Sequence, residues 1–405
     1  MARRSPLGTT VTAALAALAV LGLSACGGGE PSGESTDAGT HRVMAIGPFT
    51  ASAALPTPFP EIATGAQAAA KAVNDAGGVA GSRIEVLSCD TKGDPNEATQ
   101  CAQKAVEEGV VAVVGAFDFK GDYIAVLERA GIPVLAPFTQ SVELTSPVAY
   151  NVNGGSATLL AGEISQLAGQ GGRKLYFVAP ESAAEGGALA ALWEPVLPHF
   201  PGLEVSLITV PPDATDLSAV AAKATSGDGF GIALQAAQLV PFMTAVDPAS
   251  PGARLIGSDA NSVDASVISS LGDRIEGILA PAGYLPATTK GNTAVDAFIA
   301  AMDAVDPKAP KNDFAVAGYL GVQLFAKAAA GATEVTPESL RKALDSGTEF
   351  DLGLVPPIRF DQPSSAVPGV TRLFNTAVVH TRLQGGQFVP IEARFVDAYT
   401  GRPVG

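Results

Sequence analysis

The sequence predicts an α/β protein made of two doubly wound parallel-sheet lobes. Helical and strand patterns alternate along most of the chain, as they do in such sheets. Residues 110–114 form a continuous apolar run that ends at Gly115, which is typical of a parallel strand buried on both faces. The chain has 405 residues, more than one compact core usually holds, so two lobes are expected.

The first series of elements starts with a strand at residues 43–46 that ends at Gly47. The loop from Phe49 to Pro60 is long, and long loops in compact domains are often functional, although a surface excursion is the alternative. Small and apolar residues recur at helical spacing over 64–76, and two glycines follow. Asp94 and Pro95 have the residue types of an N-cap and a first helical position. Further strands are expected at 84–86, 110–114 and 132–135, with a helix after the loop 116–121 and a crossover strand at 150–152.

A second series repeats this alternation. Asp216 is expected to cap a helix that ends at Ala224, and 281–286 is expected to be a return crossover. A hairpin is expected about Gly385 and Gly386. The strands of this series are expected at 175–178, 205–210, 230–234 and 255–256, and the helices at 188–197, 239–246, 293–305, 314–330 and 337–344.

The N-terminus has the features of an export signal. Arg3 and Arg4 precede an apolar run over 11–23, which is too short to span a bilayer comfortably. The run leads into Leu23-Ser24-Ala25-Cys26, which resembles a bacterial lipobox, and this resemblance implies that Cys26 is lipidated and becomes the first mature residue. An ordinary signal peptide with an incidental cysteine is the alternative. The Gly/Ser-rich segment that follows is expected to be a flexible tether.

The two other cysteines are Cys89, at the end of a predicted strand, and Cys101, within the next predicted helix. An exported protein favours a disulfide between them, worth about 3 kcal/mol on the chain-entropy estimate, over two buried free thiols. A metal site is not expected, because no second Cys/His pair lies nearby.

Composition limits the function. The net charge is −15, and the sequence has no Lys/Arg cluster, so nucleic acid is not an expected partner. The three histidines, His41, His199 and His380, are scattered, and no nucleophile elbow, zinc-protease motif or phosphate-binding loop occurs. An enzyme is therefore disfavoured, and no cofactor is expected.

Three segments together resemble the solute-binding proteins of branched-chain amino acid ABC importers. They are GAQAAAKAVNDAGGVAGSRIEV, DPNEATQCAQKAVEEGVVAVVG and AGIPVLAPFTQSVELT, and the C-terminal PPIRFD and GGQFVPI are also similar to that family. The resemblance implies the type I periplasmic binding protein fold, in which three crossovers form a hinge between the lobes. It also implies a small-molecule ligand held between the lobes and delivery to a membrane permease.

The resulting organisation has five parts. They are a signal peptide (1–25), a lipidated tether (26–41), lobe 1 (42–152 plus 282–352), lobe 2 (153–281 plus 353–395) and a C-terminal tail (396–405). We expect a monomer that is lipid-anchored at the outer face of the cytoplasmic membrane. A ligand sensor of the same fold, signalling through a membrane partner, is the alternative to an importer protein.

Candidate ligand residues follow the predicted strands, because an open α/β sheet binds ligands beyond the carboxyl ends of its strands. Phenylalanine rings could enclose an apolar body, amides and Thr139 could bind polar edges, and Asp259 matches a position where the family contacts the ligand ammonium. Packing at the hinge is the alternative for the phenylalanines, and a helix N-cap is the alternative for Asp259. The candidates are Phe49, Phe117, Asp118, Phe119, Phe138, Thr139, Gln140, Gln235 and Asp259.

Overall fold

The computed structural model describes residues 39–404 except 54, 56, 141, 182–187 and 247–254. The predicted signal peptide, Cys26 and most of the predicted tether lie outside the described residues. Among the residues that are described, no helix combines the length and the hydropathy that crossing a bilayer requires.

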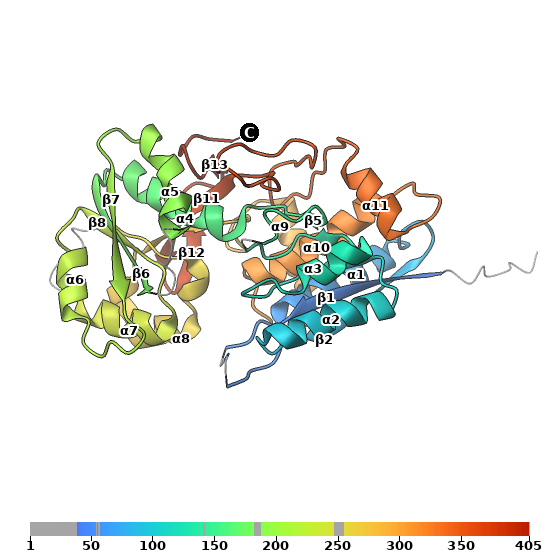
Figure 1. Cartoon of the computed structure of the whole chain (residues 1–405), viewed down its shortest axis with the longest axis horizontal. Coiled ribbons are helices and arrows are strands. Elements are labelled where there is room, and N and C mark those ends of the chain that lie inside the picture. The colour runs from blue at the N-terminus through green and yellow to red at the C-terminus, as the bar shows by residue number, and fades with distance from the viewer. Residues whose placement is uncertain are drawn as a thin grey trace, which may run out of the picture. The chain divides into compact units, whose positions relative to one another are not determined.

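The first lobe contains a five-stranded parallel sheet in the order β2-β1-β3-β4-β5. Its strands are β1 (Thr40–Gly47), β2 (Arg83–Asp90), β3 (Ala112–Val114), β4 (Val134–Leu135) and β5 (Ala149–Tyr150). Figure 1 labels β1, β2 and β5 of this sheet. The sequence predicted a crossover strand at 150–152. Instead, β5 pairs with β4 as the edge of this sheet, and the chain leaves the lobe only after Tyr150.

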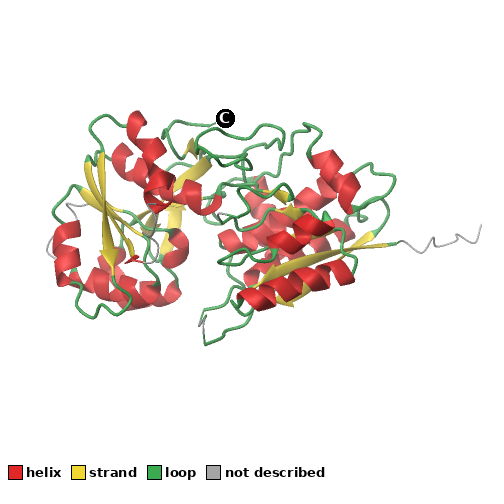
Figure 2. Ribbon diagram, in the orientation of Figure 1, coloured by secondary structure: helices red, strands yellow, loops and turns green. Residues whose placement is uncertain are grey.

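Helices cover both faces of this sheet, as the alternation of buried side chains along β1 requires (Figure 2). Val43 and Ala45 pack into a core with α1 (Glu61–Asp75), α9 (Thr293–Asp303), α10 (Asp313–Ala329) and α11 (Pro337–Leu344). Met44 and Ile46 pack into a second core with α2 (Pro95–Glu107) and α3 (Ile124–Ala130). As predicted, Asp94 caps α2, and its side chain accepts a hydrogen bond from the Asn96 amide.

Glycines let α1 and α10 approach each other closely. A Cβ added at Gly65 would lie 2.0 Å from the Ala315 carbonyl oxygen, and one added at Gly318 would lie 2.0 Å from the Ile62 carbonyl oxygen. Only glycine fits at these two positions. The close contact fixes the N-terminal end of α10, which carries Asp313 and Phe314, against the first sheet.

The second lobe contains a four-stranded parallel sheet in the order β7-β6-β8-β9. Its strands are β6 (Lys174–Pro180), β7 (Glu204–Val210), β8 (Gly229–Ile232) and β9 (Leu255–Ile256). Phe177 of β6 packs in a core with α4 (Gly155–Gly169) and α5 (Ala188–Trp193). Val178 packs on the opposite face, with α6 (Ser218–Ala224), α7 (Ala236–Ala245) and α8 (Ala265–Leu271).

A small antiparallel sheet completes this lobe. It consists of β10 (Leu279–Ala282), β11 (Ala377–Gln384), β12 (Gln387–Pro390) and β13 (Val396–Asp397). The predicted hairpin about Gly385 and Gly386 is confirmed as β11 and β12. The predicted tail is not free of the lobe, because β13 pairs with β11 and both Ala398 and Tyr399 are buried.

The chain passes between the two lobes three times: after β5, after β10, and between α11 and β11. The predicted fold of two α/β lobes is therefore confirmed.

Two helices, α4 and α8, were not predicted from the sequence. The prediction that Asp216 is the N-cap of α6 is wrong by one residue: Leu217 occupies that position, while Asp216 accepts a hydrogen bond from the Ser218 amide.

Candidate functional site

The carboxyl ends of β1, β3 and β4 open into three loops at one edge of the first sheet. These loops begin at residues 48, 115 and 136, and they carry seven of the nine predicted ligand residues. Because neighbouring parallel strands end at the same edge, the loops are expected to lie side by side. Their contacts agree with this, since the Phe138 amide donates a hydrogen bond to the Ala116 carbonyl oxygen (2.8 Å), and the Phe117 amide to that of Ile46 (2.9 Å).

Five phenylalanines from these loops and from α10 form one group, which we call the aromatic wall. The Phe314 ring stacks on that of Phe138 with ring centroids 4.2 Å apart, and its centroid lies 4.3 Å from that of Phe59. Phe117 meets Phe59, Phe119 and Phe138 edge-on at 5.4, 4.9 and 5.4 Å. The members of the aromatic wall are Phe59, Phe117, Phe119, Phe138 and Phe314.

Within the aromatic wall, Phe119 differs from the others in its exposure. Phe117, Phe138 and Phe314 are buried, whereas 51% of Phe119 is exposed. A single exposed apolar residue is common on protein surfaces, but this one adjoins the buried ring of Phe117 at the carboxyl edge of an α/β sheet, where such sheets bind ligands. Three of the predicted residues, Phe117, Phe119 and Phe138, are therefore brought together, and Phe119 is the ring that solvent or a ligand can reach.

Asp118 shapes the loop that presents Phe119. It is buried, and its Oδ1 accepts hydrogen bonds from the backbone amides of Lys120 (2.9 Å) and Gly121 (2.8 Å). An aspartate that accepts from amides two and three residues ahead stabilises a tight turn. In this structure, the predicted ligand residue Asp118 thus has a structural role within the loop.

Glu143 connects the loop that follows β3 to the loop that follows β4. Its carboxylate accepts hydrogen bonds from the Tyr123 hydroxyl (2.6 Å) and from the Gln140 amide (2.9 Å), and it is fully buried. Burial raises the pKa of Glu143, while the hydrogen bonds from Tyr123 and Gln140 act to lower it. The sequence analysis did not identify this residue.

Thr139 and Gln140 lie where the third loop meets the first crossover. The Thr139 hydroxyl is 3.3 Å from the Pro137 carbonyl oxygen and 3.1 Å from Asn151 Oδ1. The Gln140 side-chain oxygen accepts from the Ser156 hydroxyl at 3.3 Å, near the start of α4. Phe49 is half-buried, packs against the same core as the aromatic wall, and has its ring beside Gly47.

In the second lobe, the predicted residues Gln235 and Asp259 follow β8 and β9. Gln235 is exposed at the N-cap position of α7, and Asp259 is partly buried just beyond Ser258. The α-helix that follows Asp259, α8, is capped by Asp264, whose side chain accepts from the amides of Ser266 and Val267.

A buried acid that the sequence analysis missed, Glu163 of α4, lies beneath these strand ends. Its Oε1 accepts a hydrogen bond from the Ile232 amide at 2.9 Å. Two glycines make room for it, since a Cβ added at Gly231 or Gly257 would lie 2.5 or 2.9 Å from this oxygen. Burial raises the pKa of Glu163 well above its ordinary value, and the charge of Asp259 raises it further.

Asp313, at the start of α10, is a second acid whose pKa is affected by the charge of Asp259. Its carboxylate accepts from the Gly283 amide at 3.2 Å, next to the second crossover. Burial, together with the charge of Asp259, raises the pKa of Asp313 to about 7. The charge of Asp259 therefore acts on both Glu163 and Asp313, and we call these three residues the acidic group. Among the described residues, no group of three or more His, Cys, Asp or Glu has the geometry to hold a metal ion.

Comparison with known proteins identifies the family. A model of the periplasmic binding protein family matches residues 40–374. No curated protein sequence shows significant similarity to the chain.

Solved structures share the fold at low sequence identity. A 4-hydroxybenzoate complex of an ABC transporter solute-binding protein from R. palustris has a TM-score of 0.69 at 18% identity, over 89% of this chain and 98% of that one. A fatty acid ABC transporter substrate-binding protein from Thermomonospora curvata has a TM-score of 0.69 at 19% identity, over 89% and 92%. The isoleucine complex of the branched-chain amino acid transporter substrate-binding protein LivJ from Streptococcus pneumoniae has a TM-score of 0.67 at 17% identity, over 86% and 97%.

Proposed function

We propose that this chain, which belongs to the periplasmic binding protein family, is the solute-binding protein of an ABC importer and captures an amino acid or amino-acid-like compound between its lobes. The family consists of binding proteins and not of enzymes, in agreement with the lack of catalytic motifs in the sequence. The observation that carries the proposal is the aromatic wall at the carboxyl edge of the first sheet, with Phe119 exposed at its surface.

The aromatic wall supports a ligand with an apolar or aromatic body. Phe119 rests against the buried Phe117, and a ligand ring or branched chain laid on Phe119 would remove its exposed area from water. The ligands named for the similar structures, isoleucine, 4-hydroxybenzoate and fatty acid, all combine an apolar body with a carboxyl group. They differ in size and in whether they carry an amine.

The acidic group supports a cationic end on the ligand. Burial is the main cause of the raised pKa values of Glu163 and Asp313, and the charge of Asp259 adds to both, so a negative charge on Asp259 disfavours ionisation of its two neighbours. An ammonium placed beside Asp259 would relieve this repulsion and form a charge-assisted hydrogen bond. A ligand with an apolar body and an amine, such as a branched or aromatic amino acid, therefore fits better than benzoate alone.

A binding screen tests the ligand class. Isothermal titration calorimetry with the purified mature protein would compare leucine, isoleucine, phenylalanine, benzoate, 4-hydroxybenzoate and a polyol. We expect an amino acid with a large apolar side chain to bind at least about tenfold more tightly than the matching acid without an amine. Tight binding of benzoate with no binding of any amino acid would contradict the role given to the acidic group. No binding of any member would contradict the ligand class.

Uptake tests the importer role. Deletion of the gene should abolish uptake of the radiolabelled compound that binds most tightly in the screen, and the wild-type gene should restore it. Unchanged uptake, together with tight binding in vitro, would favour a sensor over an importer protein.

A further inference from the structure

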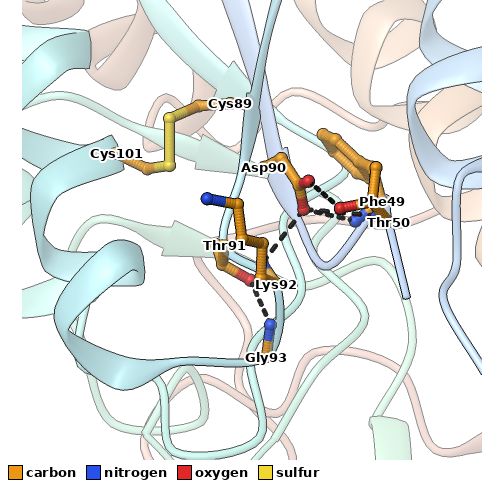
Figure 3. Close-up of a disulfide and its surroundings, with 8 residues drawn as sticks. All are labelled: Phe49, Thr50, Cys89, Asp90, Thr91, Lys92, Gly93 and Cys101. Carbon is orange, nitrogen blue, oxygen red and sulfur yellow. Dashed lines mark hydrogen bonds between the residues drawn. A yellow bond between two sulfur atoms is a disulfide. The ribbon is translucent and has the colours of Figure 1, made fainter. Parts of the chain in front are cut away.

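The side chain of Asp90 joins the segment that leaves β1 to the rest of the first lobe. We call residues 48–52 the Phe49 segment. Oδ1 of Asp90 accepts hydrogen bonds from the amides of Phe49 (2.8 Å) and Thr50 (3.4 Å), and Oδ2 accepts from the Thr50 hydroxyl (Figure 3). The same Oδ1 also accepts from the Lys92 amide at 3.0 Å. One carboxylate therefore joins the Phe49 segment to the turn that follows β2.

Two further hydrogen bonds connect the start of the loop after β1 to the turn after β2. The Thr91 amide donates to the Gly47 carbonyl oxygen at 2.9 Å, and the Ser52 hydroxyl donates to the Lys92 carbonyl oxygen at 2.8 Å. Burial raises the pKa of Asp90, but the hydrogen bonds from Thr50, Lys92 and Phe49 outweigh it and hold the pKa below its ordinary value. The ionised carboxylate is thus the form that the Phe49 segment stabilises.

Asp90 is the last residue of an edge strand. β2 is the edge strand of the first sheet, so its last residue, Asp90, has a strand neighbour on one side only, where it pairs with Gly47. A disulfide joins the preceding residue, Cys89, to Cys101 of α2, which packs on one face of the sheet, and the two Cα atoms are 5.5 Å apart (Figure 3). Cys101 is buried among the alanines of α2. The predicted disulfide is confirmed, and it braces the end of β2 against that helix.

The Phe49 segment is also connected to the aromatic wall. The Phe59 amide donates to the Pro48 carbonyl oxygen at 2.8 Å, and the Phe59 ring contacts Phe117 and Phe314. A shift of Pro48 and Phe49 would therefore move Phe59 relative to the rings it packs on. Small displacements of site residues are sufficient to weaken binding, because affinity depends on a preformed surface.

We propose that Asp90 is a positioning residue of the ligand site: braced by the Cys89–Cys101 disulfide, it fixes the Phe49 segment and, through Pro48, the Phe59 side of the aromatic wall. The proposal that the segment affects binding rests on the proposed solute-binding function. The proposal that Asp90 and the disulfide order the segment does not, and the two can be tested separately.

Hydrogen–deuterium exchange of the ligand-free mature protein tests the ordering. Asp90→Asn keeps the size of the side chain but removes its charge and one acceptor oxygen. Exchange of the Phe49 and Thr50 amides should accelerate about tenfold or more in this variant, because local opening loses hydrogen bonds to a charged acceptor. The double variant Cys89→Ala/Cys101→Ala should accelerate the same amides while the peptides of the second lobe keep their exchange rates.

Asp94→Asn is the matched control. Asp94 lies four residues further along the same turn and caps α2, a position where asparagine serves equally well, and its side chain contacts the Asn96 amide. Exchange in the Phe49 segment should therefore stay within about twofold of wild type. Unchanged exchange at Phe49 and Thr50 in a folded Asp90→Asn protein would overturn the role of Asp90. Acceleration in Asp90→Asn but not in the double cysteine variant would overturn the role of the disulfide.

Affinity tests the consequence for the site. For whichever of leucine, isoleucine, phenylalanine or 4-hydroxybenzoate binds the wild type, Asp90→Asn should weaken binding at least about fivefold, mainly through faster dissociation, and Asp94→Asn should not. Faster exchange with unchanged affinity would overturn the positioning role while leaving the proposed solute-binding function intact. Failure of all four compounds to bind the wild type would count against that function, and the exchange experiment would still decide whether Asp90 orders the segment.

Discussion

The ring of Phe138 stacks on the ring of Phe314, with centroids 4.2 Å apart and an angle of 22° between the ring planes. Phe138 follows β4, whereas Phe314 lies in the first turn of α10, which the chain reaches only after passing through the second lobe. The stack therefore joins a loop at the carboxyl edge of the first sheet to a helix that returns from the second crossover. It also makes the aromatic wall part of the core of the first lobe.

Two substitutions should separate the contribution of the aromatic wall to folding stability from its contribution to ligand binding. Phe138→Ala should lower the free energy of unfolding by about 3–5 kcal/mol, because the ring is buried and its loss leaves a cavity. Phe119→Ala should change it by less than about 1 kcal/mol, because half of this ring is exposed. Phe119→Ala should nevertheless weaken binding of the apolar compounds in the screen.

Urea unfolding and calorimetry measure these two effects. Val106→Ala is a suitable control, since Val106 is an exposed apolar residue on α2, away from the strand ends. It should alter neither stability nor affinity appreciably. If Phe119→Ala binds as tightly as wild type does, the exposed ring has no part in the site.

Asp259 should matter for binding more than for stability. If it meets a ligand charge, Asp259→Ala should cost about 2–5 kcal/mol of binding free energy, because a desolvated charge loses its partner. The matched control is Asp264→Ala, five residues further along the chain. Asp264 caps α8, so this change should cost about 1 kcal/mol of folding stability and leave affinity unchanged. Equal affinities for the wild type and Asp259→Ala would remove Asp259 from the proposed site.

Much of the fold could be predicted from local signals. The turn after β2 and the start of α2 followed from Asp94 and Pro95, and the β11–β12 hairpin from its two glycines. Helix α4 was missed because it is nearly all buried and apolar, so it lacks the polar face that makes a helical period visible. Antiparallel pairing of β10 with β11 was missed because the two strands are far apart in the sequence.

The candidate site was harder to predict, because its residues come together only through tertiary contacts. Strand ends identified Phe117, Phe119 and Phe138, but Phe59 and Phe314 join them from a loop end and a helix start. Glu163 had a readable signal, because it is the one acid in the mostly buried helix α4; the structure adds that Gly231 of β8 and Gly257, just after β9, make room for it. Sequence alone could not show that Asp259 and Asp313 interact, because this depends on how the second crossover brings α10 back.

The lipid anchor stays a prediction, because Cys26 lies outside the described residues. Mass spectrometry of the mature protein should find acylated Cys26 as its first residue, and two or more chains are expected because one chain binds membranes only marginally. Cys26→Ser should release the protein into the soluble fraction, whereas Cys89→Ser should not. An unmodified N-terminus elsewhere in the sequence would contradict the lipobox prediction.

The raised pKa of Asp313 should make stability depend on pH in a definite direction. Its pKa is about 7 in the folded protein and 3.8 in the reference state, so the folded chain holds the proton more tightly than the unfolded chain does. The resulting stabilisation is fully present below about pH 4, declines as pH rises, and is lost above about pH 7. Glu163, whose pKa is also raised, contributes with the same sign.

Unfolding by urea between pH 5 and 8 checks this for Asp313 by comparing wild type with Asp313→Asn, which cannot ionise. The stability of the wild type relative to the variant should fall by up to about 1 kcal/mol per pH unit up to about pH 7 and then level off. Asp75→Asn, which removes an exposed carboxyl on α1, provides the baseline. If the stability of the wild type relative to Asp313→Asn rose with pH instead, the fold would stabilise the charged form of Asp313.

The same carboxyl offers a test of the ligand's charge. A cation bound beside Asp313 would lower its pKa, so binding near pH 6.5 should release protons to the buffer. Calorimetric titrations in two buffers with different ionisation enthalpies measure this release directly. Leucine or phenylalanine should release protons in the wild type and fewer in Asp313→Asn. A ligand that binds tightly and takes up protons, as a carboxylate beside Asp313 would, would show that the acidic group faces the other end of the ligand.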